Sequence, residues 1–188
     1  MTQQPSQATP ADHAGLAALV RTVPDFPEPG ILFRDITPVL ADPAGLHRAV
    51  TALAAQIRGW EGTLVLGMEA RGFIFGAAAA MAAGAGFVPV RRPGKLPVPT
   101  IGTDYALEYG QGRLELDPTL LPPGSRAVIV DDLIATGGTA LAALRLAREA
   151  GAQVVGAAFV IDLPDLGGAA RLLAEGVPVH ALLRYPGS

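Results

Sequence analysis

The chain has 188 residues, of which 50% are apolar and 16% charged, and this is enough apolar material for the core of one domain. The formal net charge of −3 argues against nucleic acid as the main partner, and the lack of cysteine excludes disulfides and thiolate metal sites and fits a reducing cytoplasm. Residues 1–11, rich in Gln, Ser, Thr and Pro and without a signal-peptide pattern, are predicted to be a disordered tail before a single domain over residues 12–188.

Helices and strands are predicted to alternate along this domain. A short helix is expected at Ala14–Thr22, and Asp42 as N-cap with Pro43 at the first helical position predicts a longer helix that reaches about Trp60. The elements expected after it are strand Thr63–Gly67, helix Phe73–Ala83, strand Phe87–Val90, a hairpin over residues 104–117, strand Val128–Val130, helix Ala140–Ala150, strand Val154–Ile161, helix Leu166–Glu175 and strand Val179–Leu183. Helices alternating with continuous apolar strands predict an α/β fold with a mostly parallel sheet, whose ligands bind beyond the carboxyl ends of the strands.

One long uncharged segment, Gly72–Val90, is nearly long enough to cross a membrane. It consists mostly of Ala and Gly, which drive insertion weakly, and Pro89 interrupts it. We therefore interpret it as a small-residue helix packed on the sheet and followed by a strand, and we expect no membrane partner.

Residues 128–139 read Val-Ile-Val-Asp-Asp-Leu-Ile-Ala-Thr-Gly-Gly-Thr and join an apolar strand to a helix. Free N–H groups in such a turn, together with the positive end of the helix dipole, bind phosphate, and acids a few ångströms behind suit the hydroxyls of a ribose. The structural alternative is an ordinary strand end with a helix N-cap. No Gly-Lys-Ser/Thr follows the glycines, which excludes a P-loop, and no Gly-x-Gly-x-x-Gly opens a helix. The candidate residues are Asp131, Asp132, Ala135, Thr136, Gly137, Gly138 and Thr139.

This segment resembles the phosphoribosyl pyrophosphate (PRPP) loop of the type I phosphoribosyltransferases. Four further segments are similar to signatures of the adenine phosphoribosyltransferases, namely Phe26–Pro38, Gly67–Phe73, Arg92–Pro97 and Leu107–Gly110. The resemblance implies a type I phosphoribosyltransferase-like fold, in which a central mostly parallel sheet is flanked by helices and carries a small N-terminal hood. It also implies a cytoplasmic glycosyltransferase of purine salvage that converts adenine and PRPP to AMP and pyrophosphate with Mg2+, usually as a homodimer.

Basic residues are needed to neutralise the departing pyrophosphate. Arg71 follows a predicted strand and offers a forked cation, although it can equally form a surface salt bridge. Arg91, Arg92 and Lys95 lie in a Pro- and Gly-rich loop and are either solvated or, as the resemblance implies, close to the pyrophosphate, in part from the neighbouring subunit. The resemblance favours Lys95 and Arg92, although Arg92 replaces a more usual Lys and Pro93 stands where a basic residue is common.

A mobile lid over residues 100–113 is expected to close over the reaction and exclude water. Within it, Glu108 resembles the acidic residue that the family places near the transferring base and ribose. Glu108 and Arg71 are therefore the two candidate catalytic residues. Acid–base work, electrostatic stabilisation of the ribose and a solvated hairpin carboxylate all remain open for Glu108. Tyr109 is the candidate for closing the lid.

The resemblance places adenine between two apolar side chains, Phe33 and Leu163, with its edge read by the backbone of Leu32 and Arg34. The alternative is that these apolar residues only plug the core. Mg2+ is expected to be held mainly by PRPP and water, with the acid pair binding the ribose hydroxyls directly or through the hydrated metal, so no dedicated metal site is predicted.

Two other functions fit the same fold. One is transfer to an oxopurine such as hypoxanthine, guanine or xanthine, but the loop Asp162-Leu163-Pro164-Asp165 lacks the Lys that often donates to O6 in such enzymes. The other is a non-catalytic regulator that senses PRPP, which would need an added nucleic-acid surface that the sequence does not indicate.

Overall fold

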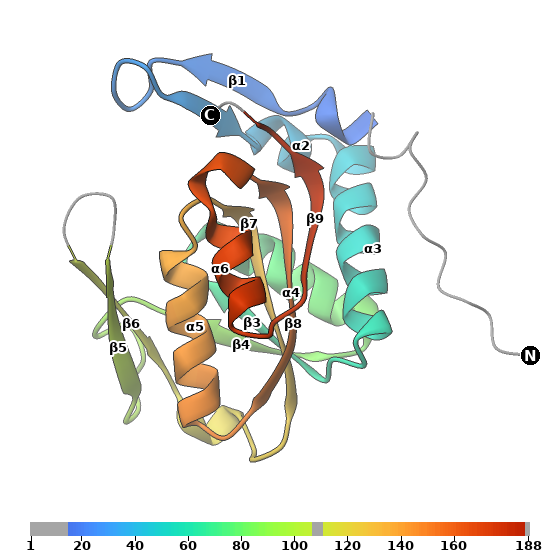
Figure 1. Cartoon of the computed structure of the whole chain (residues 1–188). Helices are drawn as coiled ribbons and strands as arrows, with labels where there is room; N and C mark the ends of the chain where they lie inside the picture. Colours follow the sequence, from blue (N-terminus) through green and yellow to red (C-terminus); the bar gives the residue numbers. More distant parts are fainter. Residues whose placement is uncertain (1–14, 107–110, 187–188) are drawn as a thin grey trace, which may run out of the picture.

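The computed structural model describes residues 15–106 and 111–186. Its centre is a five-stranded sheet in the order β4-β3-β7-β8-β9, in which every neighbouring pair of strands is parallel (Figure 1). The strands are β3 (Leu64–Met68), β4 (Gly86–Val90), β7 (Arg126–Ile134), β8 (Gln153–Asp162) and β9 (Val179–Arg184).

Helices cover both faces of this sheet, because successive strand residues point to opposite sides. Val128 and Val130 of β7 pack with α3 (Pro43–Gly59) and α4 (Arg71–Ala83). Ile129, between them, packs with α5 (Gly138–Glu149) and α6 (Gly168–Ala174) on the other face. The α/β fold with a parallel sheet between helices, predicted from the alternation of elements, is confirmed.

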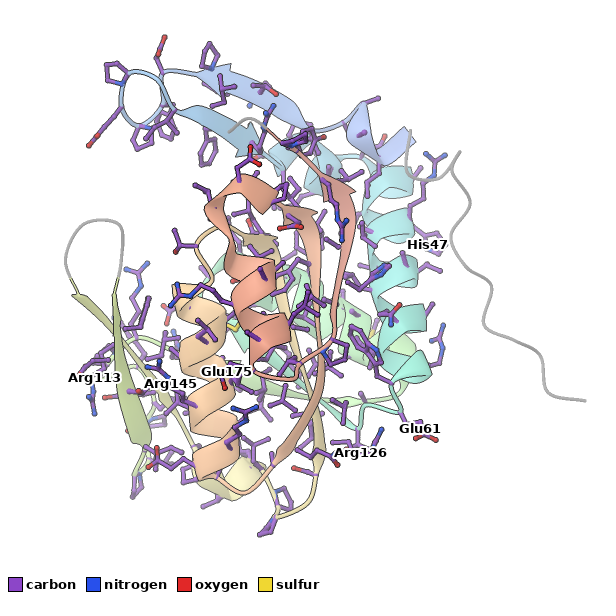
Figure 2. The ribbon with its side chains drawn as sticks, viewed as in Figure 1. His47, Glu61, Arg113, Arg126, Arg145 and Glu175 are labelled. Carbon is purple, nitrogen blue, oxygen red and sulfur yellow. The ribbon has the colours of Figure 1, made fainter. Side chains whose placement is uncertain are left out.

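Two antiparallel hairpins flank the sheet. β1 (Arg21–Pro24) pairs with β2 (Leu32–Asp35), and with α2 (Thr37–Ala41) this hairpin forms a hood across the carboxyl ends of the central strands (Figure 1). β5 (Ile101–Ala106) pairs with β6 (Gln111–Leu116) beside α5. Single 3-10 turns at Pro118–Leu120 and Pro164–Leu166 complete the described elements. Arg126 and Glu61 mark the opposite end of the sheet from the hood (Figure 2).

Local signals explain the elements that were predicted well. Asp42 caps α3, since its Oδ1 accepts a hydrogen bond from the backbone N of Gly45 at 2.6 Å, and Pro43 is the first helical residue. The uncharged segment forms α4 and β4, as predicted, and none of the helices in the described ranges is long and apolar enough to cross a membrane.

The two largest boundary errors concern the first predicted helix and the central strand. The expected helix Ala14–Thr22 is helical only at residues 15–17 within the described part, because Arg21–Pro24 pairs with β2 as a strand. The central strand, expected at Val128–Val130, continues to Ile134 because its backbone keeps pairing with β8 as far as Asp162. Both errors come from pairing partners distant in the sequence.

Candidate functional site

A cavity lies at the carboxyl ends of β3 and β7, where the order in which the chain adds strands to the sheet changes direction. From β3 the chain crosses through α4 to β4, whereas β7 pairs with the other side of β3 and leads into α5 on the opposite face. The space beyond the carboxyl ends of such a strand pair is the usual ligand site of open parallel sheets. The cavity measures approximately 260 Å³ and is lined by Glu69, Ala70, Arg71, Arg92, Tyr105, Leu114, every residue from Asp131 to Ala140, and Phe159.

The two predicted acids form one wall of this cavity from within β7, not from the loop after it. Asp132 is only 3% exposed, and its Oδ2 lies 2.9 Å from Nε of Arg71. Arg71 begins α4, and its side chain is 51% exposed, so its guanidinium is shared between the acid and the cavity. The two readings of Arg71, as ion-pair partner and as cation for a ligand, are therefore compatible.

The first turn of α4 packs closely against the other acid, Asp131. A Cβ atom on Gly72 would lie 2.6 Å from Oδ1 of Asp131, which is closer than real Cβ contacts. A side chain at this position would therefore force the Asp131 carboxylate to shift. The same Oδ1 accepts a hydrogen bond from the backbone N of Asp132 at 2.9 Å, which fixes the carboxylate at the cavity wall.

Burial changes the acidity of this pair. It raises the pKa of the Asp131 carboxyl well above its ordinary value, and the neighbouring charge on Asp132 raises that pKa further. Burial also raises the pKa of Asp132, although the Arg71 guanidinium opposes the shift. The ionised pair would therefore be stabilised by a ligand that brings hydroxyl donors or a cation.

Replacement of Asp131 by Asn is expected to reduce the pH dependence of stability in the ligand-free protein. Because the folded-state pKa lies above the ordinary value of 3.8, the stability that this proton contributes is fully present below that value and is lost as pH rises through the folded pKa. The thermal unfolding midpoint, measured from about pH 4 to pH 8, should therefore fall less with pH in Asp131→Asn than in the parent. Identical curves for the two proteins would contradict a raised pKa at this position.

Glu69 is a cavity residue to which the sequence analysis assigned no role. Its Oε2 accepts from Nε of Arg91 and from the backbone N of Arg92, both at 3.2 Å. The hydrogen bonds of Arg91 hold the pKa of Glu69 below its ordinary value. Arg91 is thus bound to Glu69, while Arg92 is the residue of the basic loop that lines the cavity. The available signal was an acid two residues before Arg71, at a strand-to-helix turn.

The predicted phosphate loop lies between β7 and α5. Gly137 occupies the N-cap position of α5 with φ of +79°, a left-handed conformation that favours glycine, and it has no side chain to cap the helix. The first turn of α5, whose N–H groups have no partner within the helix, lines the cavity through Gly138 and Thr139, beside Thr136 of the loop. These donors and the helix dipole make this end of the cavity suitable for an anion.

Several predicted residues lie outside the cavity lining. The carbonyl of Lys95 accepts from Nη1 of Arg91 at 2.9 Å, and the Lys95 side chain does not line the cavity. Leu32, Phe33 and Arg34 form β2 in the hood, and Leu163 follows β8 and packs in the core between the sheet and α3. The structure thus brings the phosphate loop, the acid pair, Arg71 and Arg92 together at the cavity, whereas the four adenine candidates do not line it.

The two lid candidates, Glu108 and Tyr109, lie outside the described residues. The described part of the same hairpin contributes Tyr105 and Leu114 to the cavity lining, and neither was predicted as a site residue. Phe159 of β8 was also missed, because a buried apolar strand residue carries no sequence signal that separates a cavity wall from the core.

Comparison with known proteins gives consistent matches. The model of the phosphoribosyl transferase domain family matches residues 40–171. An adenine phosphoribosyltransferase from Novosphingobium aromaticivorans is 63% identical over 172 residues, which cover 92% of this chain and 97% of the relative. The crystal structure of adenine phosphoribosyltransferase from Rhodothermus marinus, at 50% identity, has a TM-score of 0.86 and covers 94% of this chain and 100% of its own. The enzyme from Saccharomyces cerevisiae, crystallised with adenine and D-2,5-dideoxy-2,5-imino-altritol 1,6-bisphosphate, has a TM-score of 0.87 at 36% identity and covers 93% of this chain and 100% of its own.

Proposed function

We propose that this chain, which belongs to the adenine phosphoribosyltransferase family, transfers the 5-phosphoribosyl group of PRPP to adenine and produces AMP and pyrophosphate. The observation that carries the proposal is the cavity between β3 and β7, which combines a helix N-terminus, an acid pair and two arginines. One end suits a phosphate, the wall suits a ribose and the opposite side suits a second anion. The yeast relative, which was crystallised with adenine and a bisphosphate, supports this assignment.

Each part of the cavity has a task in this reaction. The loop from Ala135 to Thr139 holds the 5-phosphate, and Asp131 and Asp132 hold the ribose hydroxyls. Arg71 and Arg92, with Lys95 as a further candidate, neutralise the pyrophosphate as its bond to the anomeric carbon breaks. The bond from adenine N9 to that carbon then forms and the N9 proton departs. We assign Glu108 to the positive charge or the proton at this step.

Mg2+ fits the oxygen chemistry of this cavity. Asp131 and Asp132 are adjacent carboxylates, and within the described residues no three His, Asp or Glu side chains gather into a dedicated metal site. Mg2+ keeps several waters and uses few protein carboxylates, so PRPP oxygens and water would hold it, with the two acids in contact with the ribose hydroxyls or the hydrated ion. When bound, the ion supplies positive charge to the departing pyrophosphate.

For the base, we propose a site between the hood and the end of β8, with Phe33 and Leu163 on its two faces and the backbone of Leu32 and Arg34 at its edge. The position of β2 across the carboxyl ends of the strands supports this proposal (Figure 1).

We also propose a homodimer. Ile74 and Met81 on α4 are 45% and 81% exposed, and such apolar side chains suit a subunit contact. A cytoplasmic location accords with a chain that contains no cysteine.

The test of the function is pyrophosphate release from PRPP and Mg2+ with adenine, hypoxanthine, guanine or xanthine as the base. Release with adenine alone is the expected result. Release only with an oxopurine would retain the PRPP site and reject the base site. A folded protein that binds PRPP but releases no pyrophosphate with any base would be a PRPP-sensing regulator.

Replacement of Phe33 by Ala is expected to raise the KM for adenine roughly tenfold or more, since loss of an aromatic face under a base costs about 1–3 kcal/mol. The KM for PRPP should remain close to that of the parent. Initial-rate kinetics with each substrate varied in turn measure both constants.

Phe26 provides the matched control. Its ring meets the ring of Phe33 edge to face, with 5.1 Å between the centroids, and it is itself 51% exposed. Phe26→Ala removes this support but leaves the stacking ring, so the adenine KM should change less than in Phe33→Ala. Equal losses for adenine and PRPP in Phe33→Ala would instead identify Phe33 as a core residue.

A further inference from the structure

Three consecutive carbonyls, of the last residue of β7 and the first two residues of the phosphate loop, accept hydrogen bonds from Leu163 and from α6. The carbonyl of Ile134 accepts from the backbone N of Leu163 at 3.0 Å, and that of Ala135 from the backbone N of Gly168 at 2.9 Å. The carbonyl of Thr136 accepts from Nη1 of Arg171 at 2.8 Å. The start of the loop is therefore held by residues that follow it by about thirty positions in the sequence.

The three donors lie on the side of the loop away from the cavity. Ile134, Ala135 and Thr136 all line the cavity, whereas Leu163, Gly168 and Arg171 do not. The carbonyl oxygens thus point toward α6. This orientation matters for an anion, because a carbonyl oxygen turned into the cavity would repel a phosphate that the adjacent N–H groups attract.

Arg171 differs from the other two donors because it acts through a side chain. It lies on the exposed surface of α6 and spans 35 sequence positions to reach the Thr136 carbonyl. A charged donor makes a stronger hydrogen bond than a neutral one. Thr136 is also the last loop residue before Gly137, the left-handed N-cap of α5. Arg171 therefore holds the loop at the residue directly before its turn into α5.

We propose that Arg171 is a positioning residue for the 5-phosphate of PRPP, which holds the Thr136 carbonyl out of the phosphate site without contacting the substrate. This inference rests on the proposed function. It predicts a selective effect, because the base and pyrophosphate sites do not depend on this hydrogen bond.

The test compares Arg171→Ala with the parent enzyme in two assays. In steady-state kinetics the KM for PRPP should rise about tenfold, which is the equivalent of about 1.4 kcal/mol, while the adenine KM stays near the parent value. In titration calorimetry with ribose 5-phosphate, the dissociation constant should rise by a similar factor. Arg171→Lys, which retains a charged donor, should recover part of both losses.

Arg148→Ala is the matched control. Arg148 donates from Nη1 to Oε2 of Glu175 and from Nη2 to the Glu175 carbonyl, both at 2.7 Å, and so links α5 to the end of α6 without touching the loop. Glu175 lies beyond the C-terminal end of α6 (Figure 2). Loss of this second arginine should leave the PRPP KM and the ribose 5-phosphate affinity unchanged.

The outcomes separate the two proposals. A parent protein that releases no pyrophosphate with any purine base would overturn the proposed function itself. An active parent with unchanged PRPP KM and ribose 5-phosphate affinity in Arg171→Ala would overturn only the role of Arg171. Equal losses for both substrates, or losses matched by Arg148→Ala, would show that α6 contributes general stability and would also overturn it.

Discussion

The Asp132→Asn variant is expected to lose about a hundredfold in kcat/KM for PRPP while its unfolding temperature stays within about 4 °C of the parent value. The carboxylate is 3% exposed and pairs with Arg71 at 2.9 Å on the cavity wall. Asn cannot make the charged contacts that hold a ribose hydroxyl or a hydrated Mg2+, and each such contact contributes about 1.5–3 kcal/mol. The variant also releases the Arg71 guanidinium from its position beside the pyrophosphate.

Stability should change little because two effects oppose one another. The ion pair with Arg71 is lost, but Arg71 is 51% exposed and remains solvated. The cost of burying the Asp132 charge, which raises the pKa of this residue, is removed as well. Initial-rate kinetics and thermal unfolding on the same preparations measure the two effects separately.

Asp162 is the control for a buried acid outside the PRPP site. It is also 3% exposed, lies at the end of the adjacent strand β8, and pairs with Nε of Arg184 at 3.6 Å. Asp162→Asn should therefore leave the PRPP KM unchanged. An Asp132→Asn enzyme with parental turnover and PRPP KM would refute the placement of the ribose, whatever its stability.

The elements predicted correctly are those whose sequence signals lie within a few neighbouring residues. The Asp42 cap and Pro43 start α3, and the apolar run of β7 leads through glycines into α5. These signals are local because caps and turns are made by neighbouring backbone groups. The acid pair and the phosphate loop could be predicted for the same reason, since one continuous segment carries both.

The errors concern contacts between distant segments. The first two residues of β1, Arg21 and Thr22, were predicted as helix because their strand character depends on β2, including the hydrogen bond from Nε of Arg21 to Asp35 at 3.1 Å. Glu69 reaches Arg91 across the neighbouring strands β3 and β4, and Arg171 reaches Thr136 from α6. A single sequence contains no signal for such pairs, because each depends on how the elements pack.

The Gly137→Ala variant should lose about 2–4 kcal/mol of unfolding free energy and should raise the PRPP KM more than tenfold. Two penalties combine at this position. The backbone has φ of +79°, where an L side chain is strained by about 1–2 kcal/mol. The new Cβ would also lie 2.8 Å from Cα and 3.0 Å from the carbonyl oxygen of Gly168, and these backbone atoms can yield only if the loop or α6 moves.

Gly167→Ala separates the two penalties. Gly167 has φ of +74°, and a Cβ added there would meet no atom within 4 Å, so this variant carries the backbone strain without the clash. It should lose about 1–2 kcal/mol of unfolding free energy and keep a PRPP KM close to that of the parent. Chemical denaturation and initial-rate kinetics on the two variants measure both quantities.

The comparison tests whether contact with α6 sets the shape of the phosphate loop. A displaced Gly168 would weaken its hydrogen bond to the Ala135 carbonyl, which is 2.9 Å long, and would turn that oxygen toward the phosphate. Gly137→Ala would then weaken PRPP binding through the contact between the loop and α6, to which Arg171 also contributes. If the two alanine variants instead lost equal stability and equal PRPP affinity, backbone strain alone would account for both, and the packing of the loop on Gly168 would have no part in phosphate binding.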